Sequence, residues 1–395
     1  MKKIGVFTGA RAEYWLLKPL MEEINRDEEL ELVLIVSSMH LSPEFGLTYR
    51  QIEKDGFEIK EKIETLLSSD SATGVGKAVG LGLIGYAQAL ERLAPDVMVL
   101  LGDRYETLAM TIACVLHNVP VSHIHGGELS FGAWDDAFRH AITKMSLLHF
   151  TCADEYEKRV IQMGEHPDHV FNVGSLGVEA AVRTPLLTRH EFFQMAGFDP
   201  EDRFLIVTFH PVTREDEYGG SGFAELVRAL ACERFKKFRI IFTKANSDAG
   251  GRLINDLIDQ YVQACPEQAT AFDAMGQINY LSAMKYACAM AGNSSSGILE
   301  APCFCLPVVN IGSRQDGRIR PANIIDCSCD SKSIVKCLEK ALDPEFRKSL
   351  ENMENPFHKP GTAAAIKNII KEYDFDGRIT KIFFDLPERF VKGGN

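Results

Sequence analysis

The chain has 395 residues, which is too long for one hydrophobic core of ordinary size, so we expect two domains. Apolar residues make up 46% and charged residues 25% of the sequence, as in globular proteins. The net charge of −12 argues against nucleic acid as a partner, because nucleic-acid-binding proteins usually carry a basic field. A phosphorylated small ligand remains compatible with this charge, since a few local arginines suffice to bind it.

The N-terminus, MKKIGVFTGAR, contains only the short apolar run IGVF before a polar turn. So short a run predicts neither a signal peptide nor a membrane anchor, and we expect a cytoplasmic protein. The ten cysteines are scattered through the chain, which favours reduced thiols in the cytosol. The pairs Cys303/Cys305 and Cys327/Cys329 lack the CxxC spacing typical of zinc sites, so we predict no metal centre.

In the first half of the chain, apolar strands alternate with helical segments. Strands are predicted at KIGVFTG, LELVLIVSS, DVMVLLG, VPVSHIH, a short run after residue 148, and VFNVGS. Helices are predicted between them at residues 14–25, 85–92, 106–117 and 135–148. This alternation predicts a parallel, doubly wound α/β sheet.

The second half restarts the same pattern. Strands are predicted at FLIVTFHP, RIIFTKAN, CAMAGN and PVVNIG, and helices at 223–232, 249–264 and INYLSAMKYA. The stretch from Gly177 to Asp202 lacks an apolar strand, so we place the domain boundary there. The expected division is an N-terminal domain of residues 1–180, a C-terminal domain of residues 181–362, and a segment of residues 363–395 that opens with a helix at 363–373.

Polar residues follow the ends of many consecutive predicted strands. Ligands of open parallel sheets bind at the carboxyl ends of the strands, so we expect the chemistry to lie in these turns. The residues concerned are Arg11, Asp103, Arg104, His123, His125, Glu128, His210, Asn246, Asn293, Ser294, Ser295 and Arg314.

The turn NSSSG, which includes Ser294 and Ser295, lies between a strand and a helix and predicts a phosphate site. Its small residues let the backbone approach closely, and a helix N-terminus offers free N–H groups. The alternative is an ordinary serine cap. Glu300, one turn further on, is expected to accept hydrogen bonds from ribose hydroxyls rather than to lie against phosphate.

Arg11, Arg104 and Arg314 lie in strand-end turns and could bind phosphate through their planar guanidinium groups. For each of them, a surface ion pair is the alternative.

Asp103, Glu128 and Asp135 are carboxylates in or just after strand-end loops of the first domain. Separated carboxylates in one cleft suit acid and base catalysis, because their environments can drive their pKa values apart. Each of them alone is also compatible with an exposed loop acid. Asp135 shares a helix face with Arg139, and the helix dipole is expected to keep Asp135 anionic.

Several motifs in register over residues 3–330 resemble those of the bacterial UDP-N-acetylglucosamine 2-epimerases: TGARAEY, MHLSPEFG, GDRYE, HIHGGE, DDAFRHAITKMS, FHPVT, GNSSSGILEAP and NIGSRQDGR. The pattern is most similar to the hydrolysing branch, which serves sialic-acid (nonulosonic acid) synthesis. The resemblance implies a GT-B-like fold, in which two Rossmann-like domains enclose a cleft and a C-terminal helix returns to the first domain. It also implies a homodimer or larger homo-oligomer.

Carried over by motif, and with the strand-end Asn246 added, the residues that would hold UDP are Arg11, Arg104, His210, Asn246, Ser294, Ser295, Glu300 and Arg314. Asp103, Asp135 and Arg139 would match polar residues of the sugar pocket, with His40 nearby. Many relatives have a glutamate where this chain has His125, so either His125 or Glu128 takes the second catalytic role. A histidine can donate a proton near neutral pH, whereas Glu128 would need burial to raise its pKa.

The resemblance implies a reaction without metal or redox cofactor. The C2 proton of the sugar becomes acidic as the C1–O bond to UDP lengthens, and a base, preferably Asp103, removes it to give 2-acetamidoglucal. Protonation at C2 from the other face and addition of water at C1 then give N-acetylmannosamine and UDP.

Two other functions remain open at this stage. The same chemistry could act on UDP-N,N'-diacetylbacillosamine, for legionaminic-acid synthesis. A GT-B glycosyltransferase with a UDP-sugar donor is the second alternative. The carboxylates of GDRYE and DDAFRH argue against the transferase, because they suit proton transfer.

Overall fold

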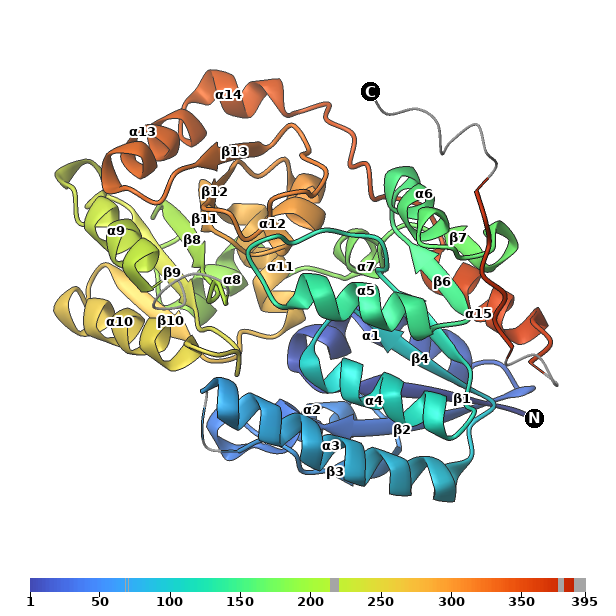
Figure 1. The fold of residues 1–395 in the computed structure, drawn as a ribbon. Coiled ribbons are helices and arrows are strands. Elements are labelled where there is room, and N and C mark those ends of the chain that lie inside the picture. Colours follow the sequence, from blue (N-terminus) through green and yellow to red (C-terminus); the bar gives the residue numbers. More distant parts are fainter. Residues whose placement is uncertain (68, 70, 214–219, 376–379, 387–395) are drawn as a thin grey trace.

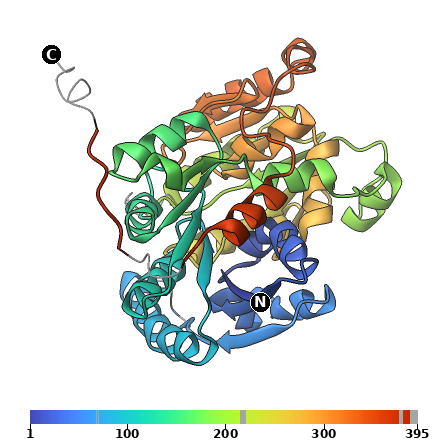
Figure 2. The ribbon, with the colours of Figure 1, turned by 90° about the vertical axis from the view of Figure 1, so that its right-hand side faces the viewer.

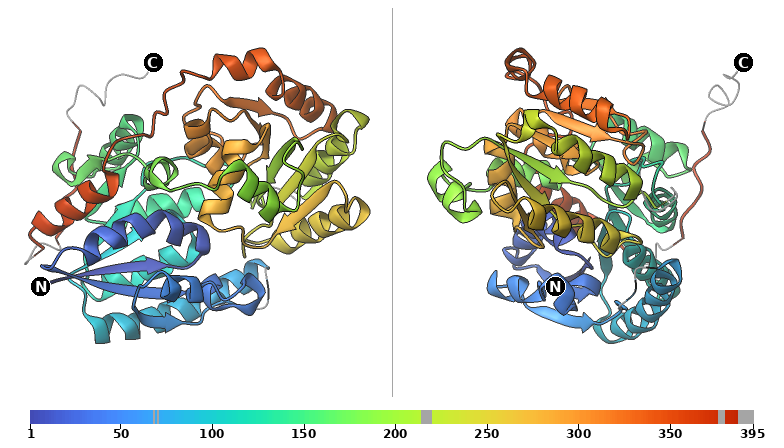
Figure 3. Two further views of the ribbon diagram at one scale, coloured as in Figure 1. Left: turned by 180° about the vertical axis from the view of Figure 1, so that it is seen from behind. Right: turned by 90° about the vertical axis from the view of Figure 1, so that its left-hand side faces the viewer.

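A computed structural model of the chain describes residues 1–67, 69, 71–213, 220–375 and 380–386. Two separate parallel sheets organise the fold, a seven-stranded sheet from residues 2–172 and a six-stranded sheet from residues 204–327. Helices cover both faces of each sheet, and the two α/β bodies lie against each other (Figures 1 and 3). The predicted pair of doubly wound parallel sheets is therefore confirmed.

The first sheet has the strand order β3-β2-β1-β4-β5-β6-β7. Its strands are β1 (Lys2–Thr8), β2 (Leu30–Ser37), β3 (Ile59–Ile63), β4 (Val97–Leu101), β5 (Val121–Ile124), β6 (Leu148–Thr151) and β7 (Val170–Asn172). The accompanying helices are α1 (Arg11–Asn25), α2 (Tyr49–Lys54), α3 (Ala72–Leu93), α4 (Tyr105–Leu116), α5 (Asp135–Met145), α6 (Asp154–Gln162) and α7 (Leu176–Arg183).

Alternate residues of β1 enter different cores, because successive strand side chains point to opposite faces of the sheet. Val6 packs in one core with Leu17 of α1. Phe7 packs in the other with Tyr86 of α3 and Ala109 of α4. Burial on both faces explains the continuous apolar runs from which the strands were predicted.

The second sheet has the order β10-β9-β8-β11-β12-β13. Its strands are β8 (Phe204–Thr208), β9 (Arg239–Thr243), β10 (Ala269–Phe272), β11 (Ala289–Gly292), β12 (Val308–Ile311) and β13 (Ile324–Cys327). Its helices are α8 (Arg189–Ala196), α9 (Gly220–Leu230), α10 (Gly251–Ala264), α11 (Gln277–Tyr286), α12 (Ser296–Leu299), α13 (Ser331–Ala341) and α14 (Pro344–Ser349). Short 3-10 turns include η1 (Ser38–Leu41), η2 (Pro43–Phe45), η3 (Pro167–His169), η5 (Glu233–Phe235) and η6 (Ala301–Phe304).

The last helix, α15 (Thr362–Glu372), packs on the first body through Ile366 and Ile370, as Figure 2 also shows. Lys367 and Lys371 form ion pairs with Asp27 near the end of α1. The domain limits at 180/181 and 362/363 remain a prediction. Residues 376–379 and 387–395 of the last segment lie outside the described residues.

Three strands that the sequence did not predict, β3, β10 and β13, all lie at sheet edges. An edge strand is less buried, so its apolar pattern is weaker; β3, for example, reads IKEKI. Helix α3 begins well before the predicted residues 85–92, since its five glycines lower the local helix propensity that prediction uses. Within the described part of the chain, neither α3 nor any other helix combines the length and apolarity needed to cross a membrane.

Candidate functional site

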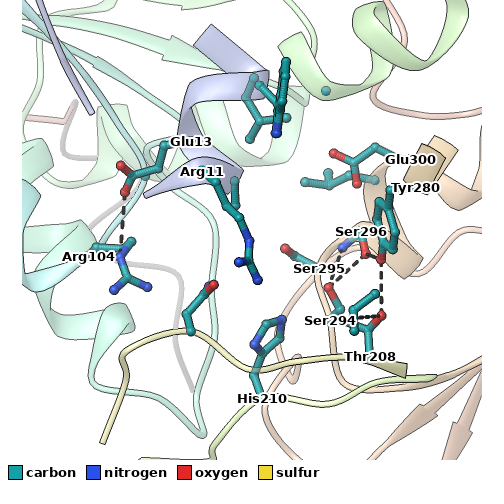
Figure 4. A pocket seen from close by; sticks show the side chains of 18 of the residues that line it. Arg11, Glu13, Arg104, Thr208, His210, Tyr280, Ser294, Ser295, Ser296 and Glu300 are labelled. Atoms are coloured by element: carbon teal, nitrogen blue, oxygen red, sulfur yellow. Dashed lines mark hydrogen bonds and ion pairs between the residues drawn. The ribbon is translucent and has the colours of Figure 1, made fainter. Parts of the chain in front are cut away.

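In each sheet the chain order reverses between two central strands, β1 and β4 in the first and β8 and β11 in the second. Ligands bind at such switch points, beyond the carboxyl ends of the strands. The turns after these strands carry Arg11, Asp103, His210 and Ser294, and all four line one cavity of about 330 Å³ between the two bodies. Figure 4 shows Arg11, His210 and Ser294 around the same space.

The cavity brings together almost all of the predicted site residues. Those in its lining are Arg11, Asp103, Arg104, His125, Glu128, Asp135, Arg139, His210, Asn246, Ser294, Ser295, Glu300 and Arg314.

His40 does not line this cavity, and neither do His123 and Asn293 of the strand-end turns; the place of His40 near the sugar stays a prediction. The His40 side chain is fully buried outside the cavity lining, with Nε2 3.0 Å from Thr8 Oγ1 and Nδ1 2.8 Å from Thr48 Oγ1. Burial lowers the pKa of His40 to about 3, so the ring is neutral. It ties η1 to the end of β1.

A glycine and an asparagine fix the second-domain turns. Gly292, the last residue of β11, has φ +140°, and a Cβ there would collide with the backbone oxygen of Thr208. The next residue, Asn293, accepts a hydrogen bond from the His210 backbone N–H at 2.7 Å and donates to the His210 carbonyl at 2.9 Å. The turns after β8 and β11 are therefore locked together, which places His210 beside the serines.

A chain of hydroxyl groups lies beneath these turns (Figure 4). Ser294 Oγ is 2.9 Å from Ser296 Oγ, which is 2.7 Å from the Tyr280 hydroxyl. The Tyr280 hydroxyl lies 3.4 Å from Thr208 Oγ1, which accepts a hydrogen bond from Thr243. The helix expected after the serines is short, because α12 has four residues and continues as η6.

Buried polar atoms on this side of the cavity that have no hydrogen-bond partner among the described residues include His210 Nδ1, Glu300 Oε2 and Arg314 Nε. Burial, with Arg314 nearby, lowers the pKa of His210 to about 3. Burial also raises the pKa of Glu300 to about 7. Buried polar groups are normally paired, so these atoms are suited to contact a ligand.

On the first-domain side, Arg139 holds Asp103. One guanidinium nitrogen of Arg139 donates to Asp103 Oδ2 and to Ser130 Oγ, and the other donates to the Glu128 carbonyl at 2.9 Å. Asp135 lies 3.7 Å from Arg314 of the second domain. Burial, with Asp103 and Asp248 nearby, raises the pKa of Asp135 to about 7, an effect opposite to the one expected from the helix dipole.

His125 and Glu128 form a close pair. Nδ1 of His125 lies 2.5 Å from Glu128 Oε1, and the other Glu128 oxygen lies 2.6 Å from Nη1 of Arg318. Burial alone would raise the pKa of Glu128, but Arg318 and His125 hold it well below its usual range. Glu128 is thus a buried anion, whereas an acid role required burial to raise its pKa.

Arg104 spans the two bodies, although the sequence assigned it to phosphate. Its guanidinium donates to Glu106 at 2.7 Å, to Asp248 at 3.0 Å and to Ser247 at 3.2 Å. Glu13 belongs to the same cluster as Arg104. Burial, together with the nearby carboxylate of Glu106, raises the pKa of Glu13 to about 8.

Sequence reasoning missed several cavity residues: Glu13, Lys244, Asp248, Phe272, Met275, Gln277 and Tyr280. Glu13 lies within the motif TGARAEY, two residues after the predicted Arg11. Phe272, Met275 and Gln277 surround the end of β10, an edge strand that was not predicted.

Among the described residues, His125, Glu128 and Cys152 offer potential metal-ligand atoms that all lie within 4.8 Å of one another. Both Glu128 oxygens already face His125 or Arg318. Burial, with Glu128 nearby, raises the pKa of the Cys152 thiol well above its usual range. Metal binding requires a thiolate, so this group is poorly suited to a cation.

The family model for UDP-N-acetylglucosamine 2-epimerase matches residues 22–371. The chain is 40% identical, over 98% of its length and 99% of the relative's, to the Campylobacter jejuni GDP/UDP-N,N'-diacetylbacillosamine 2-epimerase (hydrolyzing). It is 35% identical to the Escherichia coli polysialic acid biosynthesis protein P7, over 98% of each chain. It is 36% identical to the Legionella pneumophila UDP-N,N'-diacetylbacillosamine 2-epimerase (hydrolyzing), over 87% of this chain and 89% of that one.

Solved structures share the fold. The Neisseria meningitidis UDP-GlcNAc 2-epimerase bound to UDP-GlcNAc has a TM-score of 0.78 at 16% identity, covering 94% of this chain and 100% of that one. A complex of the Methanocaldococcus jannaschii UDP-GlcNAc 2-epimerase with UDP-GlcNAc and UDP has a TM-score of 0.77 at 17% identity, with coverage of 94% and 100%. With its sequence matched over most of its length, the chain belongs to the UDP-N-acetylglucosamine 2-epimerase family.

Proposed function

We propose that the protein is a hydrolysing 2-epimerase that converts UDP-N-acetylglucosamine and water to N-acetylmannosamine and UDP. The observation that carries this proposal is one interdomain cavity with two chemically different walls. The first-domain wall presents carboxylates and an imidazole, and the second-domain wall presents hydroxyls, an arginine and a buried glutamate.

The second-domain wall would hold the nucleotide. Arg11 reaches across from α1 toward Ser294 and Ser295, where a diphosphate would gain charge-assisted hydrogen bonds. Arg314 adds a second cation, and Glu300 would bind the ribose hydroxyls through its unpartnered oxygen. Asn246 and His210 complete this side of the cavity.

The first-domain wall would carry the proton transfers. As the C1–O bond breaks, its electron pair leaves with UDP, and Asp103 removes the C2 proton to give the glycal. Nε2 of His125, which has no hydrogen-bond partner among the described residues, would return a proton to the other face of C2. Water then supplies hydroxide to C1 and a proton to His125, and Asp103 releases the C2 proton to solvent, which restores the starting state.

Two relatives carry the word hydrolyzing in their names, which supports release of free sugar over a UDP-sugar product. The same two relatives are named for diacetylbacillosamine, so UDP-N,N'-diacetylbacillosamine is the second candidate substrate. Both substrates are UDP-linked 2-acetamido sugars and require the same chemistry at C1 and C2.

We further propose a cytoplasmic homodimer. Exposed apolar side chains lie on two packed helices: Leu81 and Ile84 on α3, and Val115 and Leu116 on α4. A second copy of the chain would cover them.

The proposed compartment rests on the thiols. All ten cysteines, each within the described part of the chain, are free, which suits a reducing compartment.

Proton NMR of the protein with each substrate in D2O, without an acceptor, tests the proposal. We expect free UDP and a mannosamine-type product with deuterium at C2. Accumulation of a UDP-linked 2-epimer would contradict hydrolysis, and turnover only with an added acceptor would indicate a glycosyltransferase. Competition between the two substrates, read as the ratio of kcat/KM values, decides which of them the site prefers.

A further inference from the structure

We propose that Arg318 of the second domain is a positioning residue for proton transfer: it holds Glu128, which in turn orients His125, so the acid–base group is complete only when the two domains meet. This inference rests on the proposed function, because it assigns the origin of one of the proton-transfer groups. Arg318 itself stays one residue removed from the reacting atoms.

Arg318 of the second domain contacts the first domain at Glu128 and Leu129. Arg318 follows β12, and its side chain is 8% exposed. Nη1 forms an ion pair with Glu128 Oε2 at 2.6 Å, and Nε donates to the Leu129 carbonyl at 3.2 Å. Gly317 permits this approach, because a Cβ on it would lie 2.7 Å from Leu129 Cβ.

The imidazole of His125 is held by its own backbone and by Glu128. His125 has φ +70°, a left-handed conformation that is uncommon for a non-glycine residue. Its backbone N–H donates to the Phe150 carbonyl at 2.9 Å, and Nδ1 faces Glu128 at 2.5 Å. Nδ1 therefore carries a proton toward the carboxylate, which leaves Nε2 toward the cavity for transfer.

The negative charge of Glu128 depends on the groups around it. The ionisable groups around the His125 and Glu128 pair are Cys152, Tyr156, Glu300, Arg139 and Arg318. Glu128 is buried, so its anion depends on neighbouring cations. Arg139 contacts Glu128 at its backbone carbonyl, which leaves Arg318 as the guanidinium paired with the carboxylate. Loss of Arg318 would favour protonation of Glu128 and remove the anion that holds the ring.

The ion pair between Arg318 and Glu128 is one of several contacts between the two domains. The segment that carries Arg318 contacts the first domain at further points: Arg314 lies 3.7 Å from Asp135, and the Ile319 backbone N–H donates to the Tyr156 hydroxyl at 3.1 Å. A separate pair, Arg252 with Glu44 at 3.0 Å, also joins the domains but lies at the surface, away from the imidazole.

The test compares Arg318→Gln, Glu128→Gln and their double variant with Arg252→Gln as the control for interdomain pairing. We expect each single variant to lose about 100-fold in kcat, within the range for general acid–base catalysis, with a small change in KM. The double variant should lose no more than either single one, because the two residues act as one unit. Arg318→Lys should recover part of kcat, and Arg252→Gln should keep the wild-type dependence of kcat on pH.

Imidazole NMR separates this inference from the proposed function. With the His125 signal assigned by its loss in His125→Gln, the pH titration of that signal should shift in Arg318→Gln and Glu128→Gln but not in Arg252→Gln. An unchanged titration, or losses in kcat that multiply in the double variant, would overturn the positioning role. Absence of turnover in the wild type would instead count against the proposed function. UDP affinity, measured by calorimetry, reports whether each variant is folded.

Discussion

The two walls of the cavity differ in how many of their charged groups are already paired. On the first-domain wall, Asp103 is held by Arg139, Glu128 by Arg318 and Arg104 by Asp248. On the second-domain wall, polar atoms of His210, Glu300 and Arg314 have no hydrogen-bond partner among the described residues, and on the first-domain wall the same holds for His125 Nε2 and Glu13 Oε1. A wall with fixed charges suits stabilisation of a transition state, because little reorganisation is needed during the reaction. A wall with unmet polar atoms gains most from ligand binding. Substitutions on the first wall should therefore lower kcat, and those on the second should weaken nucleotide binding.

The largest effect is expected for Asp103→Asn. Loss of the base should lower kcat by about 1,000-fold, within the range for proton transfer by a positioned group, while the dissociation constant of UDP changes by less than about threefold. Arg139 keeps its bonds to Ser130 and to the Glu128 carbonyl, so the wall should stay folded. Steady-state kinetics and calorimetry with UDP measure the two quantities. A parallel loss of UDP affinity would contradict the division between the walls.

The sequence predicted this cavity through topology. Arg11, Asp103, His210 and Ser294 follow the four central strands, and the carboxyl ends of parallel strands share one edge of a sheet. His125 after β5, Asn246 after β9 and Arg314 after β12 line the cavity as well, whereas His40, which follows β2, does not. Strand-end position therefore brought most of these residues to the cavity, but it did not distinguish them from His40.

The partners of the charged groups could not be predicted. Arg104 pairs with Asp248, which is far away in sequence and comes from the other domain. Asp135 shares a helix face with Arg139, yet Arg139 instead contacts Asp103 across the turn. Such choices depend on packing between elements, and local spacing does not encode them.

A smaller effect is expected for Arg314→Ala on the second wall. Hydrogen bonds to charged groups contribute about 1.5–3 kcal/mol, so the dissociation constant of UDP should rise about 10- to 100-fold, with kcat at saturation little changed. Arg320→Ala is the matched control, because Arg320 lies in the same segment but pairs with Asp326 at the surface. A similar loss of affinity in the control would indicate a disordered segment rather than a lost phosphate contact.

A third prediction concerns pH. Burial raises the pKa of Glu300 and, with Asp103 and Asp248 nearby, that of Asp135, each to about 7, so both groups change from mostly neutral to mostly ionised as the pH rises through 7. New negative charge beside the nucleotide should lower UDP affinity by about tenfold over this range, which corresponds to about one pKa unit of differential interaction.

Glu300→Gln should remove part of this pH dependence and serves as the control for titration of UDP itself. Ionisation of Glu300 and Asp135 also works against folding. Because both pKa values lie above those of the unfolded chain, the neutral forms stabilise the fold fully at low pH, and this stabilisation is lost as the pH rises through about 7. Calorimetry at several pH values measures the affinity. An affinity that is constant in the wild type, or unaffected by Glu300→Gln, would contradict the assignment of Glu300 to the nucleotide.

The smallest effect is expected from removal of divalent cations. Arg11 and Arg314 supply positive charge at the second wall, where a metal would otherwise neutralise the diphosphate. The possible ligand group on the first wall is occupied by internal contacts, since Glu128 faces both His125 and Arg318. Turnover should therefore be the same with and without EDTA. Arg314→Ala makes the test more sensitive: if Mg²⁺ partly restores UDP affinity in this variant but does nothing in the wild type, the arginine takes the place of a metal. A large loss in the wild type that Mg²⁺ restores would show that the cations of the second wall are insufficient for the reaction.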